Sequence, residues 1–203
     1  MDGARAGVPG SRRSGPVRSA AMTASSEVSP RRVFLLGLMG SGKTTVGREL
    51  AARTGWPYLD NDDLVRRSTG REPAEIEATD GEDGLHAAEA DAFELALRLE
   101  PPAIVGVAAG VIDEPDKRPR LSASGHVVWL RARPETLLQR VGTGEGRRAE
   151  ATDPEWVRQR AEERAPLFEA TATQIVDVDE MRPADIADRI VDRLRARPGQ
   201  PSS

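Results

Sequence analysis

The sequence predicts an α/β protein with three layers, in which a parallel β-sheet lies between two layers of helices. Short apolar runs, typical of strands buried in a parallel sheet, alternate along the chain with longer segments of helical periodicity. After the first apolar run, residues 37–44 read GLMGSGKT and fit the phosphate-binding pattern G-x-x-x-x-G-K-[ST]. Strand, glycine loop and helix in that order point backbone N–H groups and a helix N-terminus at an anion.

The first third of the chain supplies two strands and two helices. The apolar run at residues 33–36 predicts the first strand, and the spacing of apolar residues over 45–53 predicts a helix that ends at Gly55. Residues 56–60 form a short second strand. The polar run 61–63 then caps a helix that reaches Arg67.

The rest of the chain continues the alternation and brings the strand count to five. Helices are predicted over 73–80, 84–99, 115–122, 134–141, 153–170 (with a break near Pro166) and 183–195, and strands over 103–107, 126–130 and 174–178. The glycine-rich segment 142–153 is predicted to be flexible.

The chain contains few lysines, and one of them lies in the phosphate-binding loop, or P-loop, at residues 37–44. Of 29 basic residues only two, Lys43 and Lys117, are lysines. A compact ammonium on a flexible stem reaches between phosphates, which a planar guanidinium does not do. Lys43 is therefore predicted to bind the β- and γ-phosphates of ATP as a catalytic residue, and the Thr44 hydroxyl to bind Mg²⁺. The remaining P-loop residues predicted to bind nucleotide are Gly37, Gly40, Ser41, Gly42 and Thr45.

Composition excludes several classes of function. The chain has 203 residues, enough for one domain with a core, and no cysteine, which excludes disulfides, thiolate zinc sites and cysteine nucleophiles. Its two histidines argue against a multi-histidine metal site, so Mg²⁺ carried with the nucleotide is the one metal expected. A net charge of −4 argues against nucleic acid, and no apolar run has the length of a membrane span. A monomeric, cytoplasmic protein is expected.

The two ends of the chain read as tails around one domain. Residues 1–31 consist mostly of Gly, Ala, Ser, Pro and Arg, which predicts a disordered extension that lacks the apolar region of a secretory signal. Met22 is an alternative natural start to Met1. The P-loop domain is expected to span residues 32–197, followed by a tail at 198–203.

From Arg32 to about Leu194 the chain resembles the shikimate kinase family, whose members transfer the γ-phosphate of ATP to a ring hydroxyl of shikimate. The resemblance is carried by residues 37–44, 59–62, 68–71, 78–82, 164–168 and 171–172. It implies a P-loop kinase fold with a five-stranded parallel sheet of order 2-3-1-4-5 and a lid at about 142–153.

The resemblance also implies residue roles. Asp60 would help to hold Mg²⁺, usually through water, and Asp62 would accept a hydrogen bond from the attacking hydroxyl and act as its base. Two carboxylates at i and i+2 after a strand can both reach phosphates bound by the P-loop. The alternative role for Asp62 is a simple helix cap. Arg140 matches an arginine that packs on adenine. Arg164 matches one that binds the substrate carboxylate, a task for which a guanidinium fork is suited.

Arg147 falls at the family's lid arginine, which steadies charge in the transition state and is counted here as catalytic. The glycines at 142, 144 and 146 suit a hinge. The family has proline where this chain has Arg148, so either arginine is a candidate for the role. Two solvated surface arginines are the alternative reading.

The acceptor pocket departs from the family pattern. His86 stands where the family has a second carboxylate-binding arginine, and Glu77 stands where a phenylalanine packs on the shikimate ring. Neither replacement favours an anionic substrate. Ala108-Ala109-Gly110 replaces a turn of three glycines. His86 and Gly110 are still expected to line the substrate site, although a surface role for His86 is the alternative; Arg67 or Arg71 is the candidate to compensate for the lost arginine.

The predicted function is ATP-dependent phosphoryl transfer to a hydroxyl of a small hydroxylated metabolite, shikimate or a shikimate-like acid. If the substrate has changed, it is expected to be less anionic than shikimate. Alternatives are a kinase for another polyol or hydroxy acid, a nucleotide-binding regulatory paralogue with little or no activity, and a nucleoside or nucleotide kinase. The intact set of Lys43, Thr44, Asp60 and Asp62 argues against a regulatory paralogue.

Overall fold

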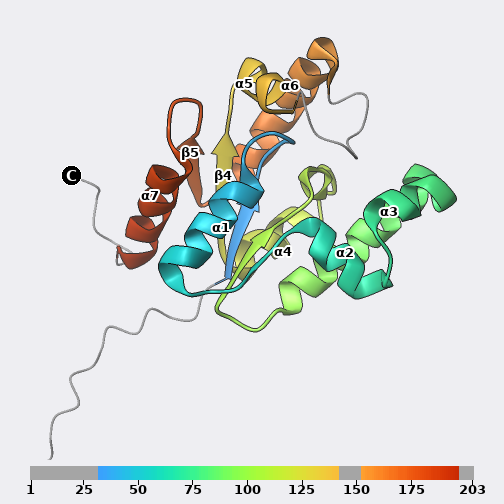
Figure 1. Ribbon diagram of the computed structural model, residues 1–203, viewed down its shortest axis with the longest axis horizontal. Helices are drawn as coiled ribbons and strands as arrows, with labels where there is room; N and C mark the ends of the chain where they lie inside the picture. Colours follow the sequence, from blue (N-terminus) through green and yellow to red (C-terminus); the bar gives the residue numbers. More distant parts are fainter. Residues whose placement is uncertain (1–31, 142–151, 197–203) are drawn as a thin grey trace, which may run out of the picture.

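A computed structural model of the chain describes residues 32–141 and 152–196. Within these ranges five parallel strands form one sheet of order β2-β3-β1-β4-β5, with helices around it (Figure 1). The strands are β1 (Arg32–Leu36), β2 (Tyr58–Leu59), β3 (Ala103–Gly106), β4 (His126–Arg131) and β5 (Gln174–Asp177). The predicted fold class and strand order are confirmed.

The helices follow the predicted alternation. They are α1 (Lys43–Thr54), α2 (Asn61–Thr69), α3 (Pro73–Arg98), α4 (Lys117–Ser124), α5 (Pro134–Val141), α6 (Pro154–Thr171) and α7 (Pro183–Arg195), with a 3₁₀ helix η1 (Ala109–Asp113) after β3. No helix in the described ranges is both long enough and apolar enough to cross a membrane.

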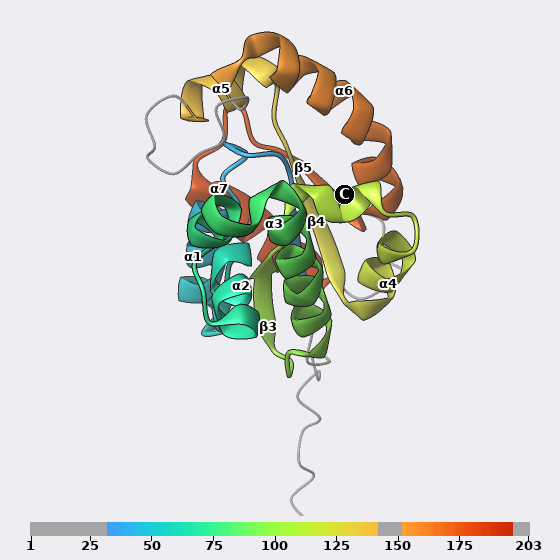
Figure 2. The same cartoon turned by 90° about the vertical axis from the view of Figure 1, so that its right-hand side faces the viewer.

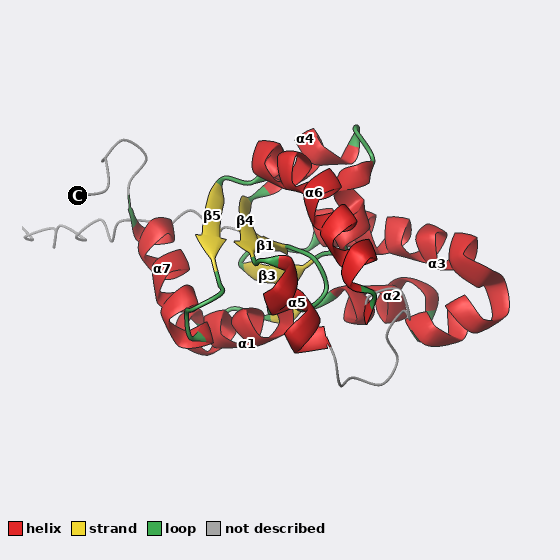
Figure 3. Cartoon of the chain, turned by 90° about the horizontal axis from the view of Figure 1, so that it is seen from above, coloured by secondary structure: helices red, strands yellow, loops and turns green. Residues whose placement is uncertain are grey.

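Two apolar cores lie on opposite faces of the sheet, because successive side chains of a strand point to opposite sides. Val33 and Leu35 of β1 pack with α1 and α7 on one face. Phe34 and Leu36 pack on the other face with α2, α3, α4 and α6. Figure 3 shows the sheet enclosed by these helices. The three central strands β1, β3 and β4 are buried on both faces, as is typical of a parallel sheet.

Two local predictions need correction. The break predicted near Pro166 is wrong, because α6 continues through it to Thr171. Proline removes one helical hydrogen bond, but the residues after it hold the helix in place: Phe168 is buried and stacks on Trp129 with ring centroids 5.5 Å apart. The 3₁₀ helix η1 lies in a segment for which the sequence predicted no element. The two separate helices predicted over 73–80 and 84–99 are confirmed within α3, because the backbone at Gly81 between them is not helical, with φ 75°.

The carboxyl ends of β1, β2 and β3 converge at one edge of the sheet, where ligands bind in open α/β folds. The P-loop follows β1, Asp60 follows β2, and residues 107–110 follow β3. In Figure 2, α2 and α3 lie together on one side, and α6 lies beside α4 on the other. The segments predicted as an N-terminal extension, a lid and a C-terminal tail fall wholly or mainly outside the described residues.

Candidate active site

The P-loop leaves helical N–H groups available to an anion. Its Gly42 is the N-cap of α1 with φ 93°, and no side chain caps the helix there. Gly40 has φ 83°, and a Cβ at that position would lie 2.8 Å from the Leu137 carbonyl oxygen, so a larger residue does not fit. The buried Ser41 hydroxyl oxygen has no hydrogen-bond partner among the residues that the structure describes. An uncapped helix start beside an unpaired hydroxyl is suited to a phosphate group.

Lys43 is held inside the loop by backbone oxygens. Its Nζ donates to the carbonyl oxygens of Gly37 at 2.7 Å and Leu38 at 3.2 Å. Burial lowers the pKa of Lys43 to about 8; the Asp62 carboxylate opposes this shift and the Arg164 guanidinium adds to it. The ammonium is thus partly desolvated and gains from a negatively charged ligand.

Asp60 and Asp62 have different local roles. Asp60 is the N-cap of α2: its Oδ1 accepts from the backbone N–H of Asp63 at 3.0 Å, and the Asp63 carboxylate accepts from the backbone N–H of Asp60 at 3.2 Å. The sequence assigned the cap to residues 61–63, so that prediction is corrected by one residue. Asp62 does not cap the helix and faces the site. Desolvation raises its pKa, with a further contribution from the Asp60 charge.

Two cavities meet at Asp62. One, of about 540 Å³, contains the P-loop residues Gly40, Gly42, Lys43, Thr44 and Thr45 together with Asp60, Asp62 and Arg140 in its lining. The other, of about 700 Å³, is lined by Asp62, His86, Gly110 and Arg164 among others. Asp62, Ala108 and Ala109 line both cavities. We call the first the donor cavity and the second the acceptor cavity.

The structure therefore brings together most of the residues that the sequence singled out. Gly37 and Ser41 shape the loop without lining the donor cavity, and a Cβ on Gly37 would lie 2.5 Å from the Ser41 Oγ. The Arg140 guanidinium donates to the Val178 carbonyl oxygen at 2.8 Å, which fixes it at the rim of the donor cavity. Arg147 and Arg148 lie outside the described residues.

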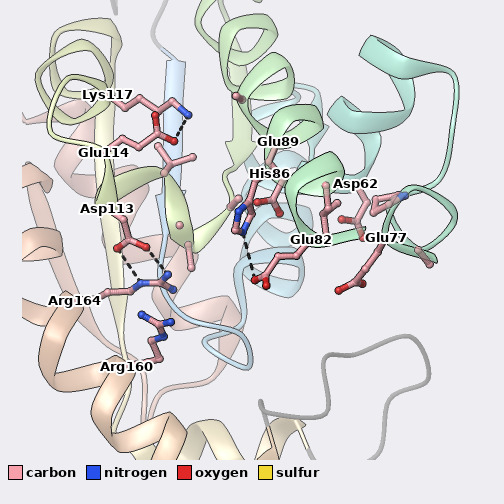
Figure 4. A pocket seen from close by; sticks show the side chains of 18 of the residues that line it. Asp62, Glu77, Glu82, His86, Glu89, Asp113, Glu114, Lys117, Arg160 and Arg164 are labelled. Carbon is pink, nitrogen blue, oxygen red and sulfur yellow. Dashed lines mark hydrogen bonds and ion pairs between the residues drawn. The ribbon is translucent and has the colours of Figure 1, made fainter. Parts of the chain in front are cut away.

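The acceptor cavity has two unlike walls (Figure 4). One wall, from α2 and α3, carries Asp62, Glu77, Glu82, His86 and Glu89. The facing wall, from η1 and α6, carries Asp113, Arg160 and Arg164. Two arginines of α6 thus lie opposite a wall rich in carboxylates.

Arg164 is engaged by a carboxylate of the protein itself. Its Nε and Nη2 donate to the two Asp113 oxygens at 3.1 and 2.5 Å, a bidentate pair of the kind that a substrate carboxylate forms. A Cβ on Gly110 would lie 3.9 Å from Arg164 Nη2, so Gly110 borders this fork. The sequence gave no reason to single out Asp113, although an acid three residues after a predicted pocket glycine was a usable signal.

His86 lines the acceptor cavity, as predicted, and its Nε2 lies 3.7 Å from Glu82 Oε1. The compensation predicted from Arg67 or Arg71 is wrong. Arg71 pairs with Asp80 at 2.6 Å, outside the acceptor cavity, and Arg67 does not line it either. Both residues belong to the α2 end and its following turn, whereas the cavity opens between α3 and α6.

Three further residues of the acceptor cavity were missed by sequence reasoning: Lys117, Trp156 and Arg160. Trp156, Arg160 and Arg164 are spaced by four residues along α6, which places them on one face of the helix. The sequence shows this spacing, but it does not show that this face of α6 borders the acceptor cavity.

The chain is similar in sequence to shikimate kinases. A family model described as shikimate kinase matches residues 39–195. The shikimate kinase of Symbiobacterium thermophilum is 36% identical over 169 residues, which cover 81% of this chain and 97% of that protein. That of Vibrio parahaemolyticus is 34% identical over 169 residues, covering 82% and 98%.

Solved structures agree with the sequence comparison. A structure of shikimate kinase from Acinetobacter baumannii in complex with shikimate has a TM-score of 0.75 at 27% identity, over 82% of this chain and 94% of that chain. A gluconokinase from Sinorhizobium meliloti has a TM-score of 0.56 at 20% identity, over 82% and 92%, and shares the fold.

Proposed function

The chain belongs to the shikimate kinase family, and we propose that it transfers the γ-phosphoryl group of ATP to a ring hydroxyl of shikimate. The observation that carries this proposal is the junction of the two cavities at Asp62, beside Lys43. A phosphoryl-transfer site needs a donor phosphate and an acceptor hydroxyl in line and shielded from bulk water. Two cavities that share a carboxylate meet that need.

On the donor side, the P-loop N–H groups and Lys43 bind the β- and γ-phosphates. The ammonium exchanges the Gly37 and Leu38 carbonyl oxygens for phosphate oxygens, which stabilises its charged form because an anionic neighbour raises its pKa. Arg140, held by Val178, borders the adenine end. Charge that builds on the transferring group is stabilised by these preorganised donors.

Thr44 and Asp60 are the residues that would hold Mg²⁺. Hydroxyl and carboxylate oxygens are the ligands that Mg²⁺ takes, and both residues line the donor cavity. Within the described ranges no three His, Cys, Asp or Glu side chains are grouped to hold a metal, so the remaining ligands would be phosphate oxygens and water. When bound, Mg²⁺ neutralises developing charge on the phosphates.

Asp62 acts on the acceptor hydroxyl. Its carboxylate accepts the hydroxyl proton as the new O–P bond forms, and the bond from the γ-phosphorus to the β,γ-bridging oxygen breaks to release ADP. A raised pKa makes Asp62 a better proton acceptor than an ordinary carboxylate. In a loose transition state most of the benefit comes from positioning the hydroxyl.

On the acceptor side, Arg164 binds the substrate carboxylate, and His86 and Gly110 border the ring. Arg147 remains the candidate for a lid arginine over the phosphates, with Arg148 as its neighbour, and the two are separated by Arg147→Ala and Arg148→Ala. We include in the proposal a monomeric enzyme in the cytoplasm, where ATP and Mg²⁺ are supplied, and a kinase domain at 32–197.

The test is a coupled ADP-release assay with ATP and Mg²⁺ over shikimate, quinate and gluconate. We expect shikimate-dependent ADP release at ordinary kinase rates, with the other acids much slower. The variant Asp62→Asn should lose roughly 10²- to 10⁴-fold in kcat, because general-base and positioning interactions are worth that much, while ATP binding persists. ADP release from gluconate but not from shikimate would reassign the substrate, and ATP binding with no ADP release over any acceptor would indicate a regulatory protein.

A further inference from the structure

The acceptor cavity poses a charge problem for an anionic ligand. Its lining holds seven carboxylates, and they are Asp62, Glu72, Glu77, Glu82, Glu89, Asp113 and Glu114. Its cationic side chains in the described ranges are Lys117, Arg160 and Arg164, with His86 as a titratable fourth. An acid that enters such a cavity is repelled unless cationic donors pair with it directly.

Arg164 alone does not solve this problem. Its guanidinium group already donates hydrogen bonds to both carboxylate oxygens of Asp113. A substrate carboxylate must share or displace that partner. It therefore gains less from Arg164 than it would gain from an unpaired guanidinium.

Two other cations of the cavity are poorly suited to help. The Lys117 ammonium donates to Glu114 Oε1 at 2.6 Å and lies 5.6 Å from the Phe93 ring centre, and the residue is only 7% exposed. His86 sits on the opposite wall beside Glu82, at 3.7 Å. Both side chains lie next to carboxylates of the protein.

Arg160 has the geometry that these two lack. It lies one helical turn before Arg164 on α6, and Figure 4 shows the two guanidinium groups next to each other on one wall. Its Nη1 is 3.2 Å from Glu163 Oε2, the one carboxylate that pairs with it among residues 32–141 and 152–196, which leaves other N–H groups of the fork able to donate. The Trp156 ring, 5.5 Å from the Arg160 guanidinium carbon, holds the group in place by stacking.

We propose that Arg160 is a second ligand of the carboxylate of the acceptor substrate. Arg160 and Arg164, both on α6, then bind that carboxylate together. Trp156 orients Arg160 and adds an apolar surface to the same wall. This inference rests on the proposed function, because it assumes an acceptor that carries a carboxylate. It predicts that Arg160 and Arg164 of α6 make the enzyme prefer a carboxylic acid over its neutral ester.

The experiment compares shikimate with its methyl ester, which lacks the negative charge, in wild type and in Arg160→Gln. We expect KM for shikimate to rise roughly 10- to 100-fold, as for loss of one partner of a partly buried charge pair, with KM for ATP unchanged. The ratio of kcat/KM for the acid over the ester should fall about tenfold or more, because the ester never used the charge.

Arg158→Gln is the matched control. Arg158 lies on α6, pairs with an acid three residues away as Arg160 does, and does not line the acceptor cavity. It should leave both substrates unaffected. Arg160→Lys keeps the charge and should recover part of the acid preference; it also serves as the deciding variant if Arg160→Gln does not fold with a wild-type thermal midpoint.

The outcomes separate this inference from the proposed function. If wild type does not phosphorylate shikimate, the proposed function fails and this inference fails with it. If wild type does so and Arg160→Gln keeps its KM for shikimate, only the role of Arg160 is overturned. An equal loss on acid and ester would also overturn it, because it would indicate a general packing defect.

Discussion

At the scale of single residues, Lys43 and Asp62 form the link between the two halves of the site. The Asp62 carboxylate raises the pKa of Lys43 and helps to keep it protonated, whereas burial disfavours the charged form of both side chains. A nucleotide phosphate that arrives beside Lys43 reverses the effect of burial on the ammonium. Nucleotide binding should therefore depend on pH in a way that reports on this one lysine.

Because the pKa of Lys43 is lowered to about 8, the ammonium that ATP needs is fully present at pH 7 and is lost as the pH rises through 8. We expect the Kd for a non-hydrolysable ATP analogue to increase about tenfold between pH 7 and pH 9. Calorimetry in buffers of different ionisation enthalpy should detect proton uptake on binding at pH 8.5. A Kd that stays constant over this range would contradict the assignment, and Lys43→Met should give weak binding with a flat profile.

Asp113 provides a second prediction at this scale. Its carboxylate occupies the Arg164 fork that the substrate is proposed to use, and its side chain is 43% exposed, which limits the strength of the pair. We expect Asp113→Asn to lower KM for shikimate about 3- to 10-fold, since an amide competes less well for the guanidinium.

The same steady-state assay should include Asp116→Asn as a control, because Asp116 lies nearby and does not line the acceptor cavity. Its kinetics should match those of wild type. A higher KM in Asp113→Asn would mean that Asp113 positions Arg164 for the substrate and does not compete with it.

At the scale of elements, the sequence predicted the strands and most helices because local patterns determine them. Gly42, Gly55 and Gly70 fix where α1 and α2 begin or end, and all three were available as signals. The features that local sequence patterns did not predict depend on packing between segments that are distant in the sequence. Whether Pro166 breaks α6 is decided by the contact of Phe168 with Trp129, and no spacing rule indicates that contact.

The candidate site divides in the same way. The P-loop and the acids after β2 are short segments with their own signatures, so their residues were predictable. The acceptor wall on α6 was not, because only the fold brings α6 across from α3. The wrong choice of Arg67 or Arg71 came from nearness in sequence, which does not measure nearness in space.

The packing of α1 on β2 gives a prediction at this scale. A Cβ on Gly47 would lie 2.2 Å from the Tyr58 ring, so alanine there must displace the ring. Overpacking costs about 1–3 kcal/mol, against about 1 kcal/mol that alanine gains over glycine in a helix. We expect Gly47→Ala to lower the free energy of unfolding by up to about 2 kcal/mol in a urea titration.

Ala52→Gly, at an exposed position of the same helix, measures the helix-propensity term alone and should cost about 0.5–1 kcal/mol. If Gly47→Ala were instead more stable than wild type by a similar amount, the close approach of Tyr58 to α1 would be refuted.

At the scale of the whole molecule, the described core begins at β1, and the two apolar clusters draw all their members from residues after Arg32. Residues 1–31 carry five arginines and two acids, with few large apolar side chains. We therefore expect a chain that starts at Arg31 to keep the thermal midpoint of the full chain within about 2 °C, since no described core residue is lost. Its kcat/KM for shikimate should also be unchanged. A large loss in either quantity would show that the N-terminal segment takes part in the fold or the site.

The many carboxylates that line the acceptor cavity oppose the binding of an anionic substrate. Carboxylates from α2, α3 and η1 surround it, and two arginines of α6 face them. This arrangement predicts an enzyme that depends strongly on α6 for recognition and on Asp62 for transfer. Both expectations assume that shikimate receives the phosphoryl group.

The most direct test of that transfer is a ³¹P NMR spectrum of the full chain incubated with ATP, Mg²⁺ and shikimate. We predict a new phosphomonoester resonance that grows in step with ADP and that is absent without shikimate or with Asp62→Asn. ADP with only inorganic phosphate, or an unchanged ATP spectrum in the presence of shikimate, would contradict the proposed function.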